Sequence, residues 1–238
     1  MKEGGKVLGD VIFNSRHSLD LNLKLKSYPS IPQSTEEYEE IEIEGRNGTL
    51  ILNKGTYKNK QITFNFTRLS DSFLDFDDVY YWLNNINDKR LIWGRRDRCY
   101  IVKKIVYGDI QQEYETIGNF DVTFMCEPFL EDLESTKQKI IGNGFNIFYL
   151  GTAPGDSIIK VGGNGNIQIA INSEAMTIKN VNEYVEIDSK LLQVRNKNGT
   201  SKDMDTLGDF PMLKNGLNII SYSGNISKLE IEYTNKYL

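Results

Sequence analysis

The chain has 238 residues and a net charge of −5, and its residues are 39% hydrophobic and 26% charged, a composition typical of a folded protein. The mild acidity argues against a dedicated nucleic-acid-binding protein, whose affinity for phosphate rests on surplus Lys and Arg. Residues 1–132 carry the whole net charge while residues 133–238 are neutral, which predicts two domains with different surfaces.

The sequence carries no visible targeting or membrane signal. The N-terminal residues are polar, and no apolar run approaches the ~20 residues that span a bilayer. The two cysteines, Cys99 and Cys126, are too few for a disulfide framework or a four-cysteine zinc site. We therefore expect a soluble protein of a reducing cytosol, with no membrane partner.

The first half begins with alternating residues that are typical of strands. Leucines alternate with polar residues from Leu19 to Leu25, which predicts one strand with four leucines on one face. Residues 36–44 embed apolar residues among glutamates and end at Asn47-Gly48, a pair that favours a tight hairpin turn. Ile62, Phe64 and Phe66 predict a further strand.

One helix interrupts these strands. An apolar stripe at helical spacing runs through Phe76, Val79, Tyr80, Leu83 and Ile86. Either Asp71 or Ser72 could cap the helix, and the aspartates that follow would lie in its first turn. Strands are expected again at residues 90–93, 100–106 and 120–126.

Residues 130–145 are polar and glycine-containing, and we interpret them as a linker. Beyond it, short apolar runs separated by turn residues predict an all-β sandwich. These runs are 146–150, 167–171, 176–178, 184–187, 191–194, 217–221 and 229–233. The glycine-rich segment 162–165 precedes a strand rather than a helix, so we interpret it as a hairpin turn and not as a phosphate loop.

No reaction centre is visible in the sequence. The single histidine, His17, has no accompanying nucleophile motif and is interpreted as a solvated turn residue. Cys126 occupies an inward strand position, where a free cysteine behaves as a small hydrophobe. Starting from Asp75, the acidic cluster lacks the glycine and glutamate of an EF-hand loop. We expect no catalysis, no cofactor and no metal site.

Two charged patches are the strongest local features of the first half. The acidic patch contains Glu39, Glu40, Glu42 and Glu44, and the basic patch contains Arg95, Arg96 and Arg98, next to Trp93 and Tyr100. Both could be ordinary solvated charges, and aromatics among basic residues also occur on nucleic-acid-binding surfaces. We favour a protein–protein role in which the acidic patch of one copy meets the basic patch of a neighbour, because opposed patches steer assembly.

Several segments together resemble the distal tail (Dit) proteins of long-tailed (siphovirus-type) bacteriophages and prophages of Gram-positive bacteria. The resemblance spans nearly the whole chain and rests on the order of its segments rather than on one motif. These segments are Phe13-Asn14, Ser18–Asp20, Leu25, Pro29–Pro32, Glu42–Leu50, the single helix, Phe120–Phe129, Gly208–Leu213, Gly216–Ile220 and Gly224-Asn225.

The resemblance implies a mainly β protein with two domains. Residues 1–132 would form a β-sandwich-type ring domain with one helix and a hairpin, and residues 133–238 a galectin-like, jelly-roll β-sandwich. Six copies would form a hub ring in the virion, at the baseplate, after assembly in the cytoplasm of the bacterial host. The ring would join the tail tube protein to the tail-tip or tail-associated lysin protein, and receptor-binding or peripheral baseplate proteins could attach outside. DNA would only pass through the channel.

Two other functions remain open. A galectin-like sandwich could bind host cell-wall carbohydrate, but residues 133–238 contain no Trp or His, and Arg195 is their single arginine. Tyr149, Tyr184, Tyr222 or Tyr233 could still stack on a sugar. A wall hydrolase would need a pair of catalytic carboxylates, and no such pair stands out.

Overall fold

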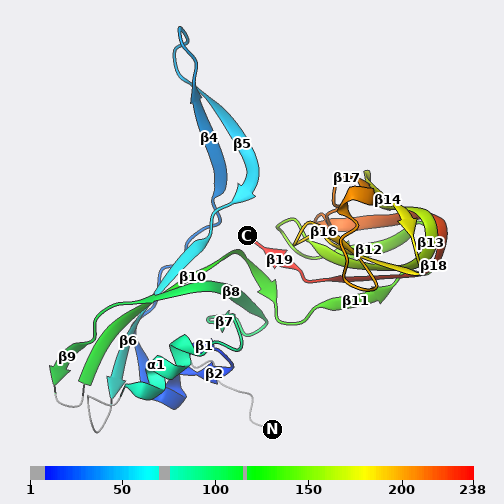
Figure 1. Cartoon of the computed structure of the whole chain (residues 1–238). Helices are drawn as coiled ribbons and strands as arrows, with labels where there is room; N and C mark the ends of the chain where they lie inside the picture. The colour runs from blue at the N-terminus through cyan, green and yellow to red at the C-terminus, as the bar shows by residue number, and fades with distance from the viewer. Residues whose placement is uncertain (1–8, 70–75, 115–116) are drawn as a thin grey trace. The chain divides into compact units, whose positions relative to one another are not determined.

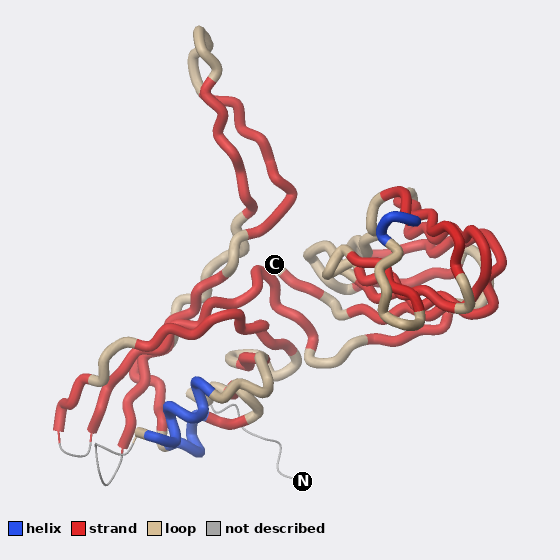
Figure 2. Tube along the Cα trace, viewed as in Figure 1, coloured by secondary structure: helices blue, strands red, loops and turns tan. Residues whose placement is uncertain are grey.

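The computed structural model describes residues 9–69, 76–114 and 117–238. The expected mainly β fold is confirmed: strands dominate, and the sheets are curled (Figures 1 and 2). The chain forms two compact units, one ending at Leu130 and the other running from Glu131 to Tyr237. Within the described residues, no helix is long and apolar enough to cross a membrane.

The first unit is built on one antiparallel sheet. Its strand order is β2-β1-β7-β8-β10-β6-β3, and β9 also pairs with β10. The elements are β1 (Ile12–Phe13), β2 (Arg16–His17), β3 (Leu23–Ser27), β6 (Lys60–Leu69), α1 (Asp77–Asn84), β7 (Arg90–Ile92), β8 (Arg98–Tyr107), β9 (Gln111–Tyr114) and β10 (Ile117–Asp132).

The core of this unit follows from strand alternation. Ile62, Phe64 and Phe66 of β6 are buried, and Phe66 lies opposite Phe120 of β10. Helix α1 covers this apolar face of the sheet and buries Val79, Trp82 and Leu83. Val79 and Leu83 belong to the predicted stripe, whereas Trp82 was not part of it, and the predicted members Tyr80 and Ile86 are 40% and 38% exposed. The indole Nε1 of Trp82 donates a hydrogen bond of 2.7 Å to the carbonyl of Phe13.

Two expectations for the first unit need correction. Leu19–Leu25 is not one strand: Ser18–Leu21 forms a 3₁₀ helix, Asn22 turns the chain at φ 56°, and β3 begins at Leu23. The core therefore takes Leu21 and Leu23 but leaves Leu19 partly exposed. The predicted helix caps, Asp71 and Ser72, lie outside the described residues, and Phe76 occupies the N-cap position.

A separate hairpin extends from the first unit (Figure 1). Among the residues that the structure describes, β4 (Glu36–Glu42) pairs only with β5 (Thr49–Tyr57). Gly45 and Gly48 turn the chain at φ 80° and 82°, a conformation that favours glycine. At the base of the hairpin, the ring of Tyr57 packs edge-on against Phe129, with centroids 4.9 Å apart.

The second unit has one 19-residue core cluster shared by all of its long strands. Its pairing order is β11-β18-β13-β14-β17, with β12 on β18, β15 on β13 and β16 on β15. The elements are β11 (Thr136–Lys139), β12 (Phe145–Tyr149), β13 (Ser157–Ile171), β14 (Glu174–Val181), β15 (Tyr184–Asp188), β16 (Gln193–Asn196), β17 (Thr206–Gly208), β18 (Gly216–Tyr233) and β19 (Lys236–Tyr237).

Strands β13 and β18 each run through two layers of a sandwich. Their pairing shifts register after Gly162 and again after Asn164, and the strands bend there. The first layer contains β16, β15, the first half of β13, the second half of β18, and β11. The second layer contains β17, β14, the second half of β13, the first half of β18, and β12. This architecture is consistent with a galectin-like sandwich.

Three expectations for the second half were wrong for one physical reason, the length of these bent strands. Residues 162–165 are not a hairpin turn but the bend of β13. A Cβ on Gly163 would approach the carbonyl oxygen of Asn225 to 2.4 Å, so glycine is needed where the strands come close. The runs 217–221 and 229–233 belong to the single strand β18, and the expected linker contains β11, which pairs with β18.

Candidate assembly surfaces

The hairpin β4–β5 has two chemically different faces. Residues that lie opposite each other in an antiparallel pair project from the same face, so the register assigns each side chain to one of the two faces. Ile41 lies opposite Leu50 and Glu39 opposite Leu52, which makes one face largely apolar (the hairpin apolar face). On the other face, Glu40 lies opposite Ile51 and Glu42 opposite Thr49 (the hairpin acidic face).

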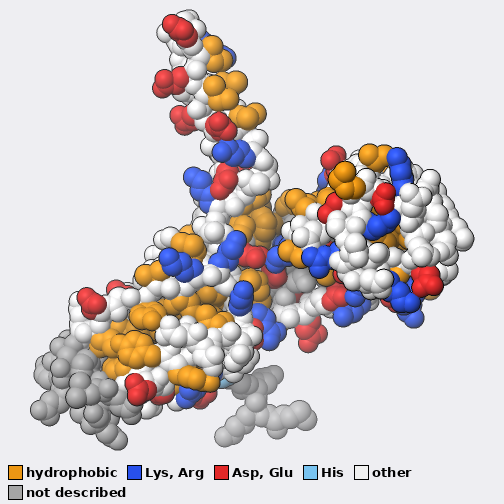
Figure 3. Space-filling view, in the orientation of Figure 1, with side chains coloured by type: hydrophobic (Ala, Val, Ile, Leu, Met, Phe, Trp, Pro, Cys, Tyr) orange, Lys and Arg blue, Asp and Glu red, His pale blue; other side chains and the backbone are white. Residues whose placement is uncertain are grey.

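The hairpin apolar face is exposed to solvent. Leu50 and Leu52 have exposed fractions of 41% and 51%, and Ile41 has 37%. Figure 3 shows hydrophobic side chains along one side of the hairpin and acidic ones along the other. A two-stranded hairpin is at best marginally stable alone in water, so a surface that covers this face would stabilise it.

The sequence grouped four glutamates that the structure separates. Glu40 and Glu42 share the acidic face, whereas Glu39 lies among the apolar residues and forms an ion pair of 3.6 Å with Lys54. Glu44 follows the end of β4, near the turn. Glu36, at the base, accepts hydrogen bonds from Tyr38, Tyr57 and Asn53, which lower the pKa of its carboxyl group.

The basic patch lies in the turn between β7 and β8 and at the first residue of β8, Arg98. Arg95 forms an ion pair of 2.7 Å with Asp97, and Arg98 approaches the same carboxylate to 3.7 Å. The Arg95 guanidinium, with a smaller contribution from Arg98, lowers the pKa of Asp97. Arg96 is exposed. The patch therefore contains its own carboxylate, Asp97, which is not among the predicted site residues.

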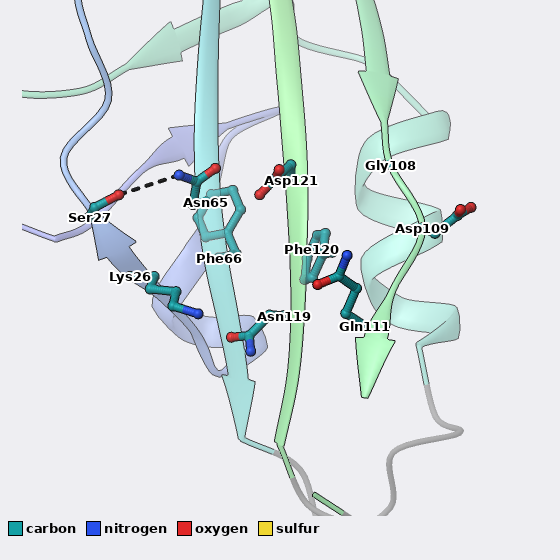
Figure 4. A pocket seen from close by; sticks show the side chains of 10 residues that line it. All are labelled: Lys26, Ser27, Asn65, Phe66, Gly108, Asp109, Gln111, Asn119, Phe120 and Asp121. Carbon is teal, nitrogen blue, oxygen red and sulfur yellow. Dashed lines mark hydrogen bonds between the residues drawn. The ribbon is translucent and has the colours of Figure 1, made fainter. Parts of the chain in front are cut away.

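A polar groove of 710 Å³ lies on the outer face of the same sheet (Figure 4). Asn65 of β6 donates to the hydroxyl of Ser27 at 3.3 Å, and Thr67 donates to Asn119 of β10 at 2.7 Å. Asp121 points into the groove, whereas Asp109 points away from it in this view. Such a surface can form hydrogen bonds, but these two carboxylates are not arranged as a pair about one bond.

The residues considered for nucleophilic chemistry have other roles. His17 lies on β2 rather than in a simple turn, and its Nδ1 bonds the carboxylate of Asp10. Burial raises the pKa of the Cys126 thiol to about 12, so it is protonated near neutral pH and serves as core. Cys99 is also buried. Within the described ranges, no group of three or more His, Cys, Asp or Glu residues could hold a metal ion.

The tyrosines considered for sugar stacking are mostly inaccessible. Tyr149 is fully buried, with its hydroxyl accepting a bond from the backbone of Lys236, and Tyr233 is 6% exposed. Tyr222 is partly buried against the core. Tyr233 borders a cavity of 180 Å³ but is itself almost fully buried. Tyr184 lines a cavity of 290 Å³ that is also bordered by four asparagines: Asn180, Asn182, Asn196 and Asn198.

The fold of both units has a counterpart among solved structures. The crystal structure of SPP1 Dit (gp 19.1), described as a paradigm of the hub adsorption apparatus in phages that infect Gram-positive bacteria, superposes with a TM-score of 0.64. The match covers 96% of this chain and 99% of that chain, at 13% identity. This chain has the fold of SPP1 Dit. The resemblance expected from the order of the sequence segments is thereby confirmed at the level of fold.

Sequence-level comparisons give no corresponding match. No family model matches the chain, and no curated protein matches it. At 13% identity, the two chains share a fold but little of their sequence.

Proposed function

We propose that this chain is a structural hub protein of a phage tail, located in the virion at the distal tail end. The observation that carries the proposal is the fold match to SPP1 Dit, a hub protein, across nearly the full length of both chains. A partial match would support a shared module only, whereas this one includes both units. Residues 1–132 would form the ring domain and residues 133–238 an outer sandwich domain.

The ring is proposed to be a homohexamer with head-to-tail contacts. Such contacts use two different patches of each subunit, and the hairpin and the turn between β7 and β8 are two such patches in one unit. The hairpin apolar face leaves Leu50 and Leu52 exposed to solvent. This exposure supports an intersubunit contact, because such a contact would bury both side chains. The acidic face would orient the contact toward Arg95, Arg96 and Arg98 of the neighbour.

The hub is proposed to act by connection and not by catalysis. Its partners would be the tail tube protein on one side and the tail-tip or tail-associated lysin protein on the other, with receptor-binding or peripheral baseplate proteins outside. Assembly would take place in the host cytoplasm, and DNA would pass through the channel without a specific contact.

Native mass spectrometry and negative-stain imaging of the purified full chain test the ring. The expected result is a closed assembly of six subunits, formed by the chain alone or after addition of the tail-tip protein. A strict monomer at high concentration, with no ring even in the presence of the tail-tip protein, would contradict the proposal. Zymography on purified cell walls should show no clearing.

A second candidate function, carbohydrate binding, is supported by the pocket beside Tyr184. Amide side chains around a half-buried aromatic ring, with Glu183, Lys197 and Lys202 also lining the pocket, could bind a sugar. Glycan-array binding by the full chain, lost in Tyr184→Ala and retained in Tyr222→Ala, would establish this function. We favour the hub because it accounts for both units, whereas the pocket involves one loop cluster.

A further inference from the structure

The two outer faces of the second unit differ in charge. In the first layer, one row of opposed residues crosses five strands with alternating sign. This row consists of Lys139, Glu230, Lys160, Glu186 and Arg195. Its members neutralise each other, for example Lys160 and Glu186 at 3.8 Å. Such a ladder is well suited to permanent contact with water.

The second layer is almost free of charge. Three segments that pair with each other contain no Asp, Glu, Lys or Arg: residues 140–155, 161–173 and 215–227. Glu174 and Lys179, both on β14, are the charged residues of its strands. Depletion of charge on a surface is characteristic of the central part of a protein–protein interface.

At the β12 edge, this uncharged face becomes apolar. Phe148 of β12 lies directly opposite Leu217 of β18, and their exposed fractions are 65% and 58%. Leu150 and Ile219 add to the same outward surface, with 59% and 44% exposed. We define Phe148, Leu150, Leu217 and Ile219 as the β12 patch.

The backbone of β12 is open to a further strand. The N–H of Ile219 donates to the Asn172 side chain and its carbonyl accepts from the Asn172 backbone, so the backbone N–H and C=O groups of Ile219 point toward β13 while its side chain points outward. The backbone groups of its partner across the pair, Asn146, must then point away from β18, and so must those of Phe148 two residues later. In the described part of the chain, β12 pairs with β18 alone. The N–H of Leu150, next along this edge, already donates to the Asn235 side chain at 3.0 Å, so an extended polypeptide could add at Asn146 and Phe148.

We propose that the β12 patch and edge bind an extended, uncharged segment of another virion protein, which adds to β12 as a strand. This inference rests on the proposed hub function and specifies where an outer component would attach. A polypeptide fits better than a sugar because the neighbours of Phe148 are hydrocarbon side chains, which cannot bond sugar hydroxyls. A second copy fits less well because pairing β12 with itself requires a two-fold axis, which a ring of head-to-tail contacts does not provide between neighbours.

The experiment uses tail particles assembled with the full chain. A photo-crosslinking amino acid replaces Phe148, and in parallel Phe148→Lys is combined with Leu217→Lys. The matched control is Leu191→Lys with Leu192→Lys, two leucines of similar exposure in the turn after β15. Thermal melting checks that each variant folds. All four side chains are exposed, so the melting temperatures should stay close to that of the parent chain.

The expected result has two parts. Position 148 crosslinks to another virion protein, identified by mass spectrometry. Particles assembled with the Phe148 and Leu217 double variant contain normal amounts of the chain but about tenfold less of the crosslinked protein. Particles assembled with the control variant contain normal amounts of both.

Several results would overturn the inference. They are a crosslinked dimer of this chain, an absence of crosslinks with unchanged particle composition, or binding of purified wall polysaccharide that the variant loses. Absence of the parent chain from tail particles would overturn the proposed function together with this inference. Its presence without crosslinks would overturn this inference alone.

Discussion

Asn14 connects the end of helix α1 to strand β1. Its side-chain nitrogen donates to the carbonyls of Trp82 and Asn85, and its oxygen accepts from the backbone N–H groups of Asn87 and Asp88. Asn14 adopts φ 51°, which asparagine tolerates better than most residues. One side chain thus satisfies four backbone groups at a helix end.

The first prediction concerns Asn14→Ala. Loss of these bonds in a strained conformation should lower the free energy of unfolding by about 2–3 kcal/mol. Chemical denaturation followed by Trp fluorescence measures this change, because Trp82 and Trp93 both lie in the first unit. Asn59→Ala, at an exposed position between β5 and β6, serves as the control and should change stability by less than about 0.5 kcal/mol. Equal effects of the two substitutions would refute the role assigned to Asn14.

The second prediction concerns Lys60, which is 3% exposed in the first unit. Burial lowers the pKa of its ammonium group. Below that lowered pKa the folded state must hold a buried charge, and above the unfolded value of 10.5 neither state is charged. Lys60→Met should therefore raise stability at pH 7 by about 1 kcal/mol, with a smaller gain at pH 10. Denaturation at both pH values tests this, with exposed Lys58→Met as the control, and a destabilised Lys60→Met would contradict it.

At the scale of single elements, each hairpin face should have its own effect on assembly. Leu50→Lys with Leu52→Lys places two charges on the hairpin apolar face and should abolish ring formation while leaving the melting temperature nearly unchanged. Leu191→Lys with Leu192→Lys is the matched control, because it makes the same change on two exposed leucines of the second unit, outside the proposed ring contact. Native mass spectrometry gives the readout. Rings that persist in the double variant would remove the hairpin apolar face from the interface.

The charged first layer of the second unit predicts sensitivity to acid. Glu230 is hydrogen-bonded by Lys228 and Glu232 by Ser135, and these bonds lower the pKa of each carboxyl below the ordinary 4.5. A carboxyl whose pKa is lowered on folding stabilises the protein above its unfolded pKa, and this contribution disappears as the pH falls through the folded value. The protection factors of amide hydrogen exchange in β13 and β18, which are corrected for the intrinsic pH dependence of exchange, should therefore fall below about pH 4.5, and less so at high salt, because exposed pairs are screened. Glu230→Gln with Glu232→Gln should flatten this pH dependence, and an unchanged profile would contradict it.

Comparison of the elements shows what short-range patterns can predict. Alternation identified β6 and the end of β10, and the three- and four-residue spacing identified α1, because each face packs on one core. The same alternation misled at Leu19–Leu25, where Asn22 turns the chain. Segment 162–165 was wrongly predicted to be a turn. Gly163 is required by the close approach of Asn225 in β18, and its neighbours in sequence do not distinguish it from a turn glycine. For the hairpin, the glutamates were visible in sequence, but their distribution over two faces required the register.

For the whole molecule, the charge difference between the halves has a specific structural form. The acidic excess of the first half includes the hairpin, whereas the second unit balances its charges strand by strand in one layer. Asp97 already pairs with Arg95, so part of the basic patch is neutralised within the chain. An intersubunit charge contact would therefore depend on Arg96 and on how far Arg95 and Arg98 can be shared between two acidic partners.

The last prediction tests that contact by charge reversal. Glu40→Lys with Glu42→Lys changes the hairpin acidic face, and Arg95→Glu with Arg96→Glu changes the basic patch. Each double variant should weaken ring association by about 1–2 kcal/mol per interface through like-charge repulsion. Combining all four substitutions in one chain should restore much of the lost association, because the reversed patches attract again.

Lys103→Glu with Lys104→Glu, the same charge change on exposed residues of β8, is the control and should leave rings intact. Sedimentation at low and high salt measures association, and the defects of the double variants should shrink as salt screens the charges. A quadruple variant no better than either double variant would mean that these two patches do not meet across the interface. In that case the hairpin apolar face would have to provide the specificity of the contact.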